Sequence, residues 1–406
     1  MPTTRSDAAE YIRLEEQYGA HNYHPLDVVI QRAEGVWVWD VAGQKYLDFL
    51  AAYSAVNQGH AHPKIRQALV EQAERVTLTS RAFRNDQLGP LYQQVHELSG
   101  YAKMLPMNSG AEAVETAIKA ARKWGYKRKG IPDGKAEILT FDGNFHGRTT
   151  TIVGFSTEAQ YKDGFGPFTP GFRVLPYGEL EAIRGAMHSH VAAVLVEPIQ
   201  GESGIIVPPA GYLRGIEQLC RQHRALFIAD EIQSGLGRTG KLFAFEHEGV
   251  RPDVVIVGKA LAGGFYPVSA ILADDEVMGV FHPGDHGSTF GGNPLGCAVA
   301  RAALRVLVEE QLVENSAVQG EYFLQRLRTI HSPRIKEVRG RGLWIGLELT
   351  AQAGGARRYC EALQQRGLLC KETHVNTIRF APPLCIRREE LDWALERVAA
   401  VFAELA

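Results

Sequence analysis

Two charged side chains stand at the ends of apolar segments that are typical of buried strands. Lys259 closes the run DVVIVGK, and Asp230 closes the run ALFIAD. A lysine amine can form a Schiff base with an aldehyde, and a carboxylate can keep a pyridinium nitrogen protonated. The two side chains together therefore suit a pyridoxal phosphate site. Taken singly, Lys259 could be a strand end that faces solvent, and Asp230 could be a helix N-cap.

A helix start supplies the third part of this site. Ser109, Gly110 and Ala111 open a segment whose apolar residues recur at the helical period, namely Val114, Ala117, Ile118, Ala121 and Trp124. The first turn of a helix has free backbone N–H groups and the positive end of the helix dipole, which suit a phosphate. The plainer alternative is an ordinary helix start with no ligand.

The elements that must position these residues follow an α/β pattern. Continuous apolar runs at 137–141, 192–197, 225–230 and 253–259 are separated by segments of helical length. Strands that are apolar on both faces are typical of a mainly parallel sheet covered by helices. In open sheets of this kind, ligands bind at the carboxyl ends of the strands, where Asp230 and Lys259 would lie.

The two ends of the chain predict a second, smaller α/β domain. Segments 36–40 and 45–49 are predicted to form a β-hairpin around a turn that contains Gly43, and strands are expected at 342–349 and 377–380. A long helix should begin at Pro294 and a closing helix near Glu389. The predicted division is an N-terminal segment 1–50 that contributes to the small domain, a large cofactor-binding domain 51–295, and a C-terminal small domain 296–406.

Composition and charge exclude several classes of function. The 44 Lys and Arg residues nearly balance the 46 Asp and Glu residues, giving a net charge of −2, so no positive field favours nucleic acid or a membrane surface. No apolar run approaches the roughly 18 residues of a membrane span, and the first residues lack the apolar core of a signal peptide. Five widely spaced cysteines indicate reduced thiols and a cytoplasmic protein.

Two short patterns imitate known motifs. GLGRTG at 235–240 matches the dinucleotide fingerprint, but DEIQS separates it from the preceding strand, and no helical period follows it. GHAH at 59–62 offers two histidines without a nearby third metal ligand. We therefore expect neither a nucleotide site nor a metal site at these segments.

Longer motifs along nearly the whole chain resemble a known family. The resemblance is carried by HNYHPL, YSAVNQGHAHP, TLTSRAF, NSGAEAVETAIKAARKWGY, GNFHGRT, DGFGPFTPGF, VEPIQGESGI, LFIADEIQSGLGRTGK, VIVGKALAGGFYPVSA, HGSTFGGNPLGC and IRFAPPL. These strings are similar to those of the ornithine aminotransferases, a branch of the class III pyridoxal phosphate-dependent aminotransferases. The resemblance implies fold type I, with a large domain whose mainly parallel sheet is covered by helices and a smaller α/β domain.

The resemblance also implies a role for each residue of the cofactor site. Lys259 would be the Schiff-base lysine and the base that moves the proton, and Asp230 would pair with the pyridinium nitrogen. The other implied contacts are Gln233 at the phenolic oxygen, Phe145 on the ring, Ser109, Gly110 and Ala111 at the phosphate, and Ser288 and Thr289 at a subunit interface. Thr289 would reach the partner's phosphate, so a homodimer or higher oligomer with shared active sites is expected. His146 follows Phe145 where some family members carry Trp.

The substrates that the resemblance implies are L-ornithine and 2-oxoglutarate. Arg148 would hold the distal carboxylate of the keto acid and Arg379 its α-carboxylate, because arginine suits bidentate carboxylate binding. Glu202 would pair with Arg379 while ornithine reacts, and Tyr23 and Tyr53 would line the ornithine end. The plainer alternatives are a surface ion pair for Arg379, simple packing for the tyrosines and a turn cap for Glu202.

Other functions remain in competition. The nearest is another class III aminotransferase acting on N-acetylornithine or 4-aminobutyrate. Tyr23 and Tyr53 favour ornithine over these substrates, because those relatives generally have other residues at the two positions. A nucleotide-linked enzyme using GLGRTGK is disfavoured by the context of that motif. A catalytically silent binding protein is disfavoured by the presence of Lys259, Asp230 and both arginines.

Overall fold

A seven-stranded sheet forms the centre of the protein in the computed structural model, which describes residues 8–405. Every neighbouring pair in it is parallel except the two made by the strand Ser269–Ala273, which is antiparallel to both of its neighbours. The prediction of a mainly parallel sheet is therefore confirmed. In spatial order its strands are β4 (Lys103–Met107), β10 (Ser269–Ala273), β9 (Val254–Val257), β8 (Leu226–Asp230), β7 (Val191–Val196), β5 (Glu137–Phe141) and β6 (Phe172–Leu175).

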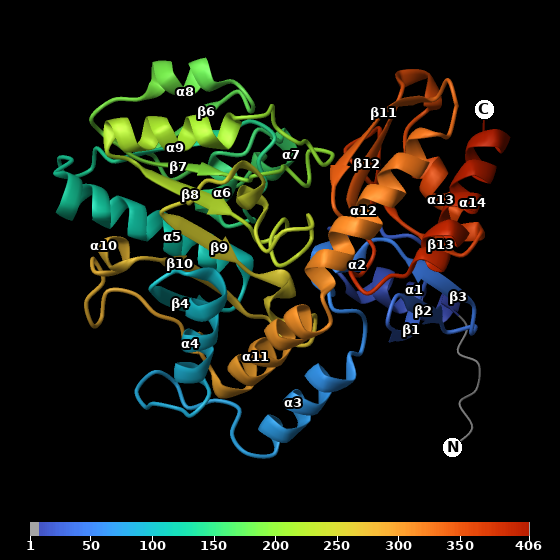
Figure 1. Ribbon diagram of the computed structural model, residues 1–406, viewed down its shortest axis with the longest axis horizontal. Helices are drawn as coiled ribbons and strands as arrows, with labels where there is room; N and C mark the ends of the chain where they lie inside the picture. Colours follow the sequence, from blue (N-terminus) through green and yellow to red (C-terminus); the bar gives the residue numbers. More distant parts are fainter. Residues whose placement is uncertain (1–7, 406) are drawn as a thin grey trace.

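Helices cover both faces of this sheet (Figure 1). On one side lie α5 (Gly110–Trp124) and α10 (Asp275–Met278), and on the other α8 (Leu180–Ala186) and α9 (Tyr212–His223). Side chains alternate along each strand, so Val254 and Ile256 belong to the apolar cluster around α5. Their neighbours Val255 and Val257 belong to the cluster on the opposite side. Burial on both faces explains why these strands are uninterrupted apolar runs.

The predicted helix at Gly110 is confirmed as α5, and its start is fixed by a capping box. Ser109 Oγ accepts the Glu112 N–H at 3.2 Å, and Glu112 Oε2 accepts the Ser109 N–H at 2.8 Å. The apolar face that the period predicted is buried through Trp124. This cap holds the first turn of the helix beside the carboxyl ends of the strands.

Two four-stranded sheets lie at the centre of a second part of the molecule, which is called the second half below and contains segments from both ends of the chain. The first joins the predicted N-terminal hairpin to a short strand far along the chain, and the second contains both predicted C-terminal strands. The first has the order β1 (Ile30–Glu34), β2 (Trp37–Asp40), β3 (Lys45–Asp48), β13 (Leu368–Leu369). The second has the order β11 (Ile335–Arg341), β12 (Trp344–Leu349), β15 (Thr377–Phe380), β14 (Lys371–Thr373). The exact domain boundaries stay a prediction.

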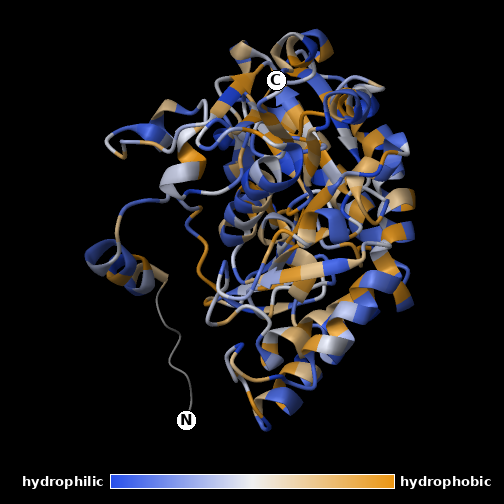
Figure 2. Ribbon diagram, turned by 90° about the vertical axis from the view of Figure 1, so that its left-hand side faces the viewer, coloured by the Kyte–Doolittle hydropathy of each residue, from blue (hydrophilic) through white to orange (hydrophobic). Residues whose placement is uncertain are grey.

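The remaining helices surround these sheets. Helix α11 (Pro294–Glu309) begins at the predicted proline and lies beside α3 and α4, and α14 (Arg388–Glu404) is the predicted closing helix. Helix α1 stands away from the body of the molecule (Figure 2). Within residues 8–405, no helix has the length and hydropathy needed to cross a membrane. The other helices are α1 (Ala8–Tyr18), α2 (Ala51–Ser54), α3 (Pro63–Ala73), α4 (Leu88–Ser99), α6 (Thr150–Gly154), α7 (Ala159–Lys162), α12 (Leu312–Arg328) and α13 (Arg357–Gln365).

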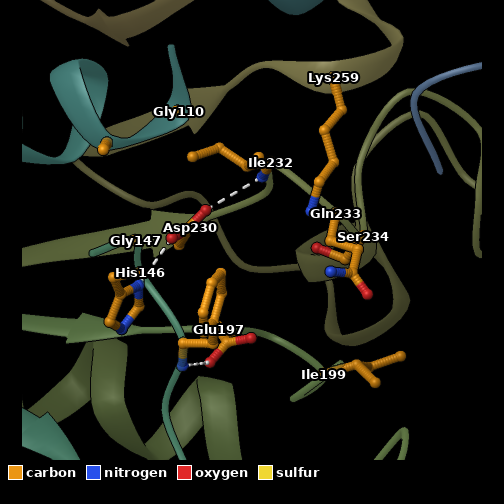
Figure 3. Close-up of a pocket in the computed structure, with 12 residues that line it drawn as sticks. Gly110, His146, Gly147, Glu197, Ile199, Asp230, Ile232, Gln233, Ser234 and Lys259 are labelled. Carbon is orange, nitrogen blue, oxygen red and sulfur yellow. Dashed lines mark hydrogen bonds and ion pairs between the residues drawn. The ribbon is translucent and has the colours of Figure 1, made fainter. Parts of the chain in front are cut away.

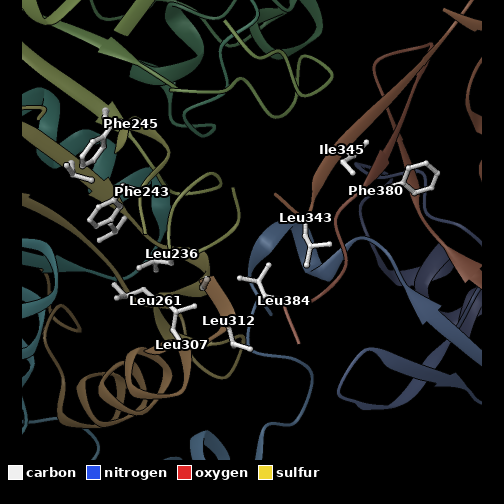
Figure 4. Close-up of a cluster of buried hydrophobic side chains, with 14 of the residues drawn as sticks. Leu236, Phe243, Phe245, Leu261, Leu307, Leu312, Leu343, Ile345, Phe380 and Leu384 are labelled. Atoms are coloured by element: carbon white, nitrogen blue, oxygen red, sulfur yellow. The ribbon is translucent and has the colours of Figure 1, made fainter. Parts of the chain in front are cut away.

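One apolar cluster continues from the large sheet to the second half. Leu236, Leu307 and Leu384 come from three distant parts of the sequence and belong to this cluster (Figure 4). Because each is almost completely buried, separating the two halves would expose apolar surface to water. The carboxyl ends of the central strands are thereby held facing the second half.

The GLGRTG segment lies at this boundary as a buried turn. Its Arg238 donates to the carbonyl oxygens of Leu343 at 2.8 Å and Pro382 at 2.7 Å, and to Asn57 Oδ1 at 2.5 Å. A short 3₁₀ turn at Ala244–Glu248 follows it, with no α-helix whose N-terminus could bind a phosphate. The segment therefore joins the two halves of the molecule.

Candidate active site

Three titratable side chains meet where β7, β8 and β9 end side by side. Glu197 follows β7, Asp230 is the last residue of β8, and Lys259 comes two residues after β9. They line a cavity of about 220 Å³, shown in Figure 3. The full lining is Gly110, Ala111, Phe145, His146, Gly147, Glu197, Ile199, Asp230, Ile232, Gln233, Ser234 and Lys259. Six predicted cofactor residues are among them.

Lys259 enters the cavity from a strained turn. Its own φ of 44° lies in the left-handed region, which a residue with a side chain adopts at some energetic cost. Figure 3 shows the side chain extending from the strand end toward Gln233. Burial lowers the pKa of Lys259 below its usual value, which favours the neutral, nucleophilic amine. The alternative of a solvent-facing strand end is therefore wrong.

Asp230 is held by two donors below the cavity. Its Oδ2 lies 2.6 Å from Nδ1 of His146, and its Oδ1 accepts the Ile232 N–H at 3.0 Å. Both side chains of the ion pair are almost fully buried, with exposures of 4% and 1%. Burial alone would lower the pKa of His146, but the hydrogen bond and charge of Asp230 outweigh burial and raise it. The raised pKa favours the protonated form of His146, which would donate from Nδ1 to Asp230 Oδ2.

Glu197 is a cavity residue that the sequence reasoning missed. Its Oε1 accepts the Phe145 N–H at 2.8 Å, and its Oε2 accepts the Gly201 N–H at 3.4 Å. Burial raises the pKa of Glu197 to about 7. The signal was present in the sequence, because Glu197 closes the apolar run AAVLVE in the same way as Asp230 closes its own. The carboxyl group joins the Phe145 loop to the segment that carries Glu202.

The start of α5 forms the opposite wall of the cavity. Gly110 and Ala111 line it, and a Cβ on Gly110 would lie only 3.1 Å from Ile232 Cδ1. Ser109 is exposed beside a neighbouring pocket that also includes Gly110 and Lys259. The backbone N–H groups of this first turn are the natural site for a phosphate.

The residues predicted at a subunit interface lie outside the cavity. Ser288 Oγ accepts from Asn108 Nδ2 at 2.8 Å, while Thr289 is exposed. Their contacts with a partner's cofactor stay a prediction.

Arg379 and Glu202 form the ion pair that the resemblance implied. Arg379 Nη2 lies 3.0 Å from Glu202 Oε1 and also donates to the Gly201 carbonyl oxygen at 3.2 Å. Gln233 bridges the pair, because its Nε2 donates to Glu202 Oε1 at 3.1 Å and its Oε1 accepts from Arg379 Nη1 at 3.4 Å. Arg379 is buried, with 2% of its side chain exposed, whereas Glu202 is 28% exposed. The alternatives of a surface ion pair for Arg379 and a turn cap for Glu202 are wrong.

The electrostatics of Glu202 follow from these contacts. Burial alone would raise the pKa of Glu202, but the charges of Arg379 and Lys259, with the hydrogen bonds from Gln233 and Arg379, outweigh it and lower that pKa. Glu202 is therefore anionic and competes with any carboxylate that approaches Arg379.

The remaining predicted substrate residues surround this pair at different depths. The Tyr53 ring lies 5.1 Å from Arg379 Cζ. Tyr23 is 76% exposed and does not line the cavity. Arg148 is exposed, and its Cζ lies 4.1 Å from the Tyr161 ring and 5.7 Å from the Phe145 ring. Nothing in the sequence pattern distinguished Tyr161, whose role depends on a contact between distant loops.

The histidines of GHAH each have a carboxylate partner. His60 Nε2 lies 2.7 Å from Asp48 Oδ2, and His62 Nε2 lies 3.2 Å from Glu310 Oε1. Among residues 8–405, no three His, Cys, Asp or Glu side chains gather as a metal site would require.

The cavity fits pyridoxal phosphate on the chemistry of its walls. It combines a buried lysine, a buried carboxylate paired with a histidine, an aromatic side chain and a helix N-terminus. Lys259 would hold the cofactor, Asp230 would face its ring nitrogen, and Gly110 and Ala111 would receive its phosphate.

Comparison with known proteins agrees with this geometry. Residues 18–402 match the family described as aminotransferase class-III. The ornithine aminotransferase of Bordetella pertussis is 59% identical over 394 residues, which cover 97% of this chain and 96% of that protein. The solved structure of an ornithine aminotransferase from Toxoplasma gondii, whose description mentions partial occupancy of PLP, has a TM-score of 0.97 at 44% identity, covering 99% of this chain and 95% of that one.

An acetylornithine aminotransferase is also among the similar structures. The enzyme from Elizabethkingia anophelis has a TM-score of 0.90 at 48% identity and covers 98% of this chain and 100% of that one. The match of the family over residues 18–402, the similar structures and the composition of the cavity all lead to the same assignment. The chain belongs to the class III aminotransferases, which depend on pyridoxal phosphate and have fold type I.

Proposed function

We propose that the protein is an ornithine δ-aminotransferase. It would transfer the δ-amino group of L-ornithine to 2-oxoglutarate in a ping-pong reaction, giving glutamate 5-semialdehyde and glutamate. The observation that carries this proposal is the buried Arg379, which is paired with Glu202 beside the cavity that contains Lys259. The similarity to several ornithine aminotransferases supports it.

Lys259 and Asp230 supply the chemistry of this chain at the cofactor end. Bound pyridoxal phosphate acts as an electron sink for the carbon that loses its proton. Lys259 Nζ, whose pKa is lowered by burial, would take that proton and return it to the neighbouring carbon. Asp230, which is hydrogen-bonded to His146, would stabilise positive charge at the ring nitrogen.

The ion pair of Arg379 and Glu202 controls which amine of the substrate reaches the cofactor. Ornithine and glutamate both carry an α-carboxylate, and a free Arg379 would bind that carboxylate and bring the α-amine to the cofactor. While Glu202 occupies Arg379, the α-amino acid end of ornithine is directed away, and the δ-amine is presented. For 2-oxoglutarate, Arg379 would bind the α-carboxylate once Glu202 turns aside.

The distal carboxylate of 2-oxoglutarate needs a second cation, and Arg148 is suited to supply it. Among the described residues, no carboxylate lies within ion-pair distance of Arg148. The guanidinium is instead oriented by the Tyr161 ring. A dicarboxylate could therefore use both arginines, whereas ornithine has one carboxylate.

N-acetylornithine is the second candidate substrate. The similarity to the Elizabethkingia anophelis acetylornithine aminotransferase favours it. Its acetylated α-nitrogen has no positive charge, so it would lose attraction to Glu202. The two substrates therefore differ at the group that Glu202 would face.

The test is an absorbance spectrum of the purified protein loaded with pyridoxal phosphate. A visible cofactor band that L-ornithine removes and N-acetylornithine leaves in place supports the proposal. Faster loss of the band with N-acetylornithine would move the function to that substrate. A protein that shows no such band even with added cofactor would contradict the assignment of the site.

The cellular setting forms part of the same proposal. The enzyme would act in the cytoplasm as a homodimer or higher oligomer in which Ser288 and Thr289 approach the neighbouring site. Its reaction would connect arginine catabolism with proline biosynthesis. Size-exclusion chromatography with light scattering would test the oligomer, because a monomer retaining full activity would contradict the shared site.

A further inference from the structure

The segment that carries Glu202 is held by the sheet that carries Arg379. Arg339 lies on β11 and is buried, with 9% exposed. Its Nε donates to the carbonyl oxygens of Gly204 at 3.1 Å and Ile205 at 3.2 Å, and its Nη2 donates to Gly204 at 2.7 Å. One guanidinium thus fixes two successive peptide groups just after Glu202.

Thr373 holds the same segment from another strand. It lies on β14, is 5% exposed, and donates its hydroxyl to the backbone carbonyl oxygen of Glu202 itself. The sheet also approaches the segment closely, because a Cβ on Gly346 would lie 2.8 Å from the Gly204 carbonyl oxygen. Contacts from three strands therefore fix the backbone on the C-terminal side of Glu202.

The backbone before Glu202 is also fixed. Gly201 donates its N–H to Glu197 and accepts from Arg379 through its carbonyl oxygen. The Glu202 side chain, by contrast, is 28% exposed, and its polar contacts are with Arg379 and Gln233. The carboxylate can turn toward solvent while the peptide groups on both sides keep their partners.

The charge of Arg339 is balanced on its far side. Its Nη1 donates to Glu337 Oε2 at 2.8 Å and to Glu348 Oε2. A buried guanidinium is stable when its charge is paired and its hydrogens have acceptors. The two glutamates satisfy the charge, and the remaining N–H groups are directed at the segment of Glu202.

We propose that Arg339 and Thr373 are positioning residues that determine which amine the enzyme accepts. They hold the Glu202 backbone so that its carboxylate stays on Arg379 until a keto acid displaces it, and unmasking occurs by rotation of the Glu202 side chain alone. The inference rests on the proposed function. It adds that selectivity depends on a backbone clamp supplied by the C-terminal sheet.

The cleanest test replaces Thr373 by valine, which keeps the shape of the side chain and removes only the hydroxyl. The measured quantity is the ratio of single-turnover rate constants for glutamate and ornithine. We expect Thr373→Val to raise this ratio by about 3- to 10-fold, the effect of losing one hydrogen bond. Thr373→Ser retains the hydroxyl and should keep the wild-type ratio.

Arg339→Lys extends the test to the second clamp. Lysine keeps the positive charge beside Glu337 and Glu348, but its ammonium lacks the planar fork that reaches two carbonyl oxygens. We expect the ratio to rise at least as much as in Thr373→Val. Arg341→Lys changes an exposed residue at the end of the same strand and should leave the ratio unchanged.

A double variant separates this inference from the proposed function. If the clamp acts only through Glu202, Thr373→Val should add less than about twofold to the ratio in a Glu202→Ala background. An unchanged ratio in Thr373→Val, with a raised ratio in Glu202→Ala, would overturn the clamp and leave the masking role intact. Failure of the proposed function would show separately, as a wild-type enzyme that does not react with ornithine.

Discussion

The site contains two buried ion pairs that differ in their access to solvent. His146 and Asp230 are 2.6 Å apart, and both side chains are almost completely enclosed. Arg379 and Glu202 are 3.0 Å apart, but the carboxylate of Glu202 is partly open to solvent. The enclosed pair can keep a constant charge beside the cofactor, whereas the open pair can exchange one carboxylate for another.

The difference in solvent exposure between the two pairs explains how one cavity can bind two substrates in different ways. Taking a charge from a buried pair without replacement costs several kcal/mol, so the His146–Asp230 pair should stay intact through both half-reactions. At Arg379 an incoming α-carboxylate can replace Glu202, so the cation is never left alone. The same physical rule therefore makes one pair permanent and the other a switch.

Breaking the enclosed pair should have the largest effect. Asp230→Asn removes the charge beside the cofactor and leaves His146 buried without an anion. We expect both half-reactions to slow by about 10²- to 10⁴-fold, which corresponds to a rise of about 3–5 kcal/mol in the activation free energy. Single-turnover kinetics with ornithine and with 2-oxoglutarate measure this, and a loss confined to one half-reaction would contradict the shared role of Asp230.

Removing the cation of the open pair should affect one substrate more than the other. Arg379→Met would lower kcat/KM for 2-oxoglutarate by about 10²-fold, because a charge-assisted contact of about 1.5–3 kcal/mol is lost, and would lower that for ornithine by less. Arg148→Met removes the cation proposed for the distal carboxylate and should lower kcat/KM for 2-oxoglutarate by less, because Arg148 is exposed. Equal losses for both substrates in Arg379→Met would refute the switch.

The smallest effect on activity is expected at Glu197, which bonds the Phe145 and Gly201 backbones near both pairs. Its pKa is raised from 4.5 to about 7, so the folded protein binds an extra proton between those values. The contribution of Glu197 to the free energy of unfolding is therefore fully present below pH 4.5 and is lost as the pH rises through about 7. Glu197→Gln should weaken that pH dependence, by at most about 3 kcal/mol.

Urea unfolding at pH 5.5 and pH 8.5 measures this change. Glu202→Gln serves as the opposite case, because the pKa of Glu202 is lowered and its stabilisation is lost only in acid. That variant should be less stable than the wild type at both pH values. If the free energy of unfolding of Glu197→Gln changed between the two pH values as much as that of the wild type, a neutral buried Glu197 would be contradicted.

The enclosed end of the site was largely predictable from the sequence. Lys259 and Asp230 each close a continuous apolar run, and parallel strands bring their carboxyl ends to one edge. The helix period and the polar start of α5 predicted the phosphate wall. These are local patterns, and the short-range rules of strand and helix formation translate them directly into positions.

The open end could not be predicted in the same way. Gln233, Glu202 and Arg379 come from three segments that meet only after the second half packs against the first. The strands β4, β6 and β10 were also absent from the prediction. For β6 the reason is that the strand is partly exposed and no continuous apolar run marks it. Contacts such as Arg148 on Tyr161 depend on loop geometry that spacing does not encode.

The central claim is that Glu202 masks Arg379 so that ornithine reacts through its δ-amine. The most direct measurement mixes wild-type and Glu202→Ala enzyme, both loaded with pyridoxal phosphate, with glutamate or ornithine and follows the cofactor band through one turnover. The account predicts that the glutamate rate rises by about tenfold or more relative to the ornithine rate, as expected for a freed cation of about 1.5–3 kcal/mol. Rates for both amines that fall together would contradict it.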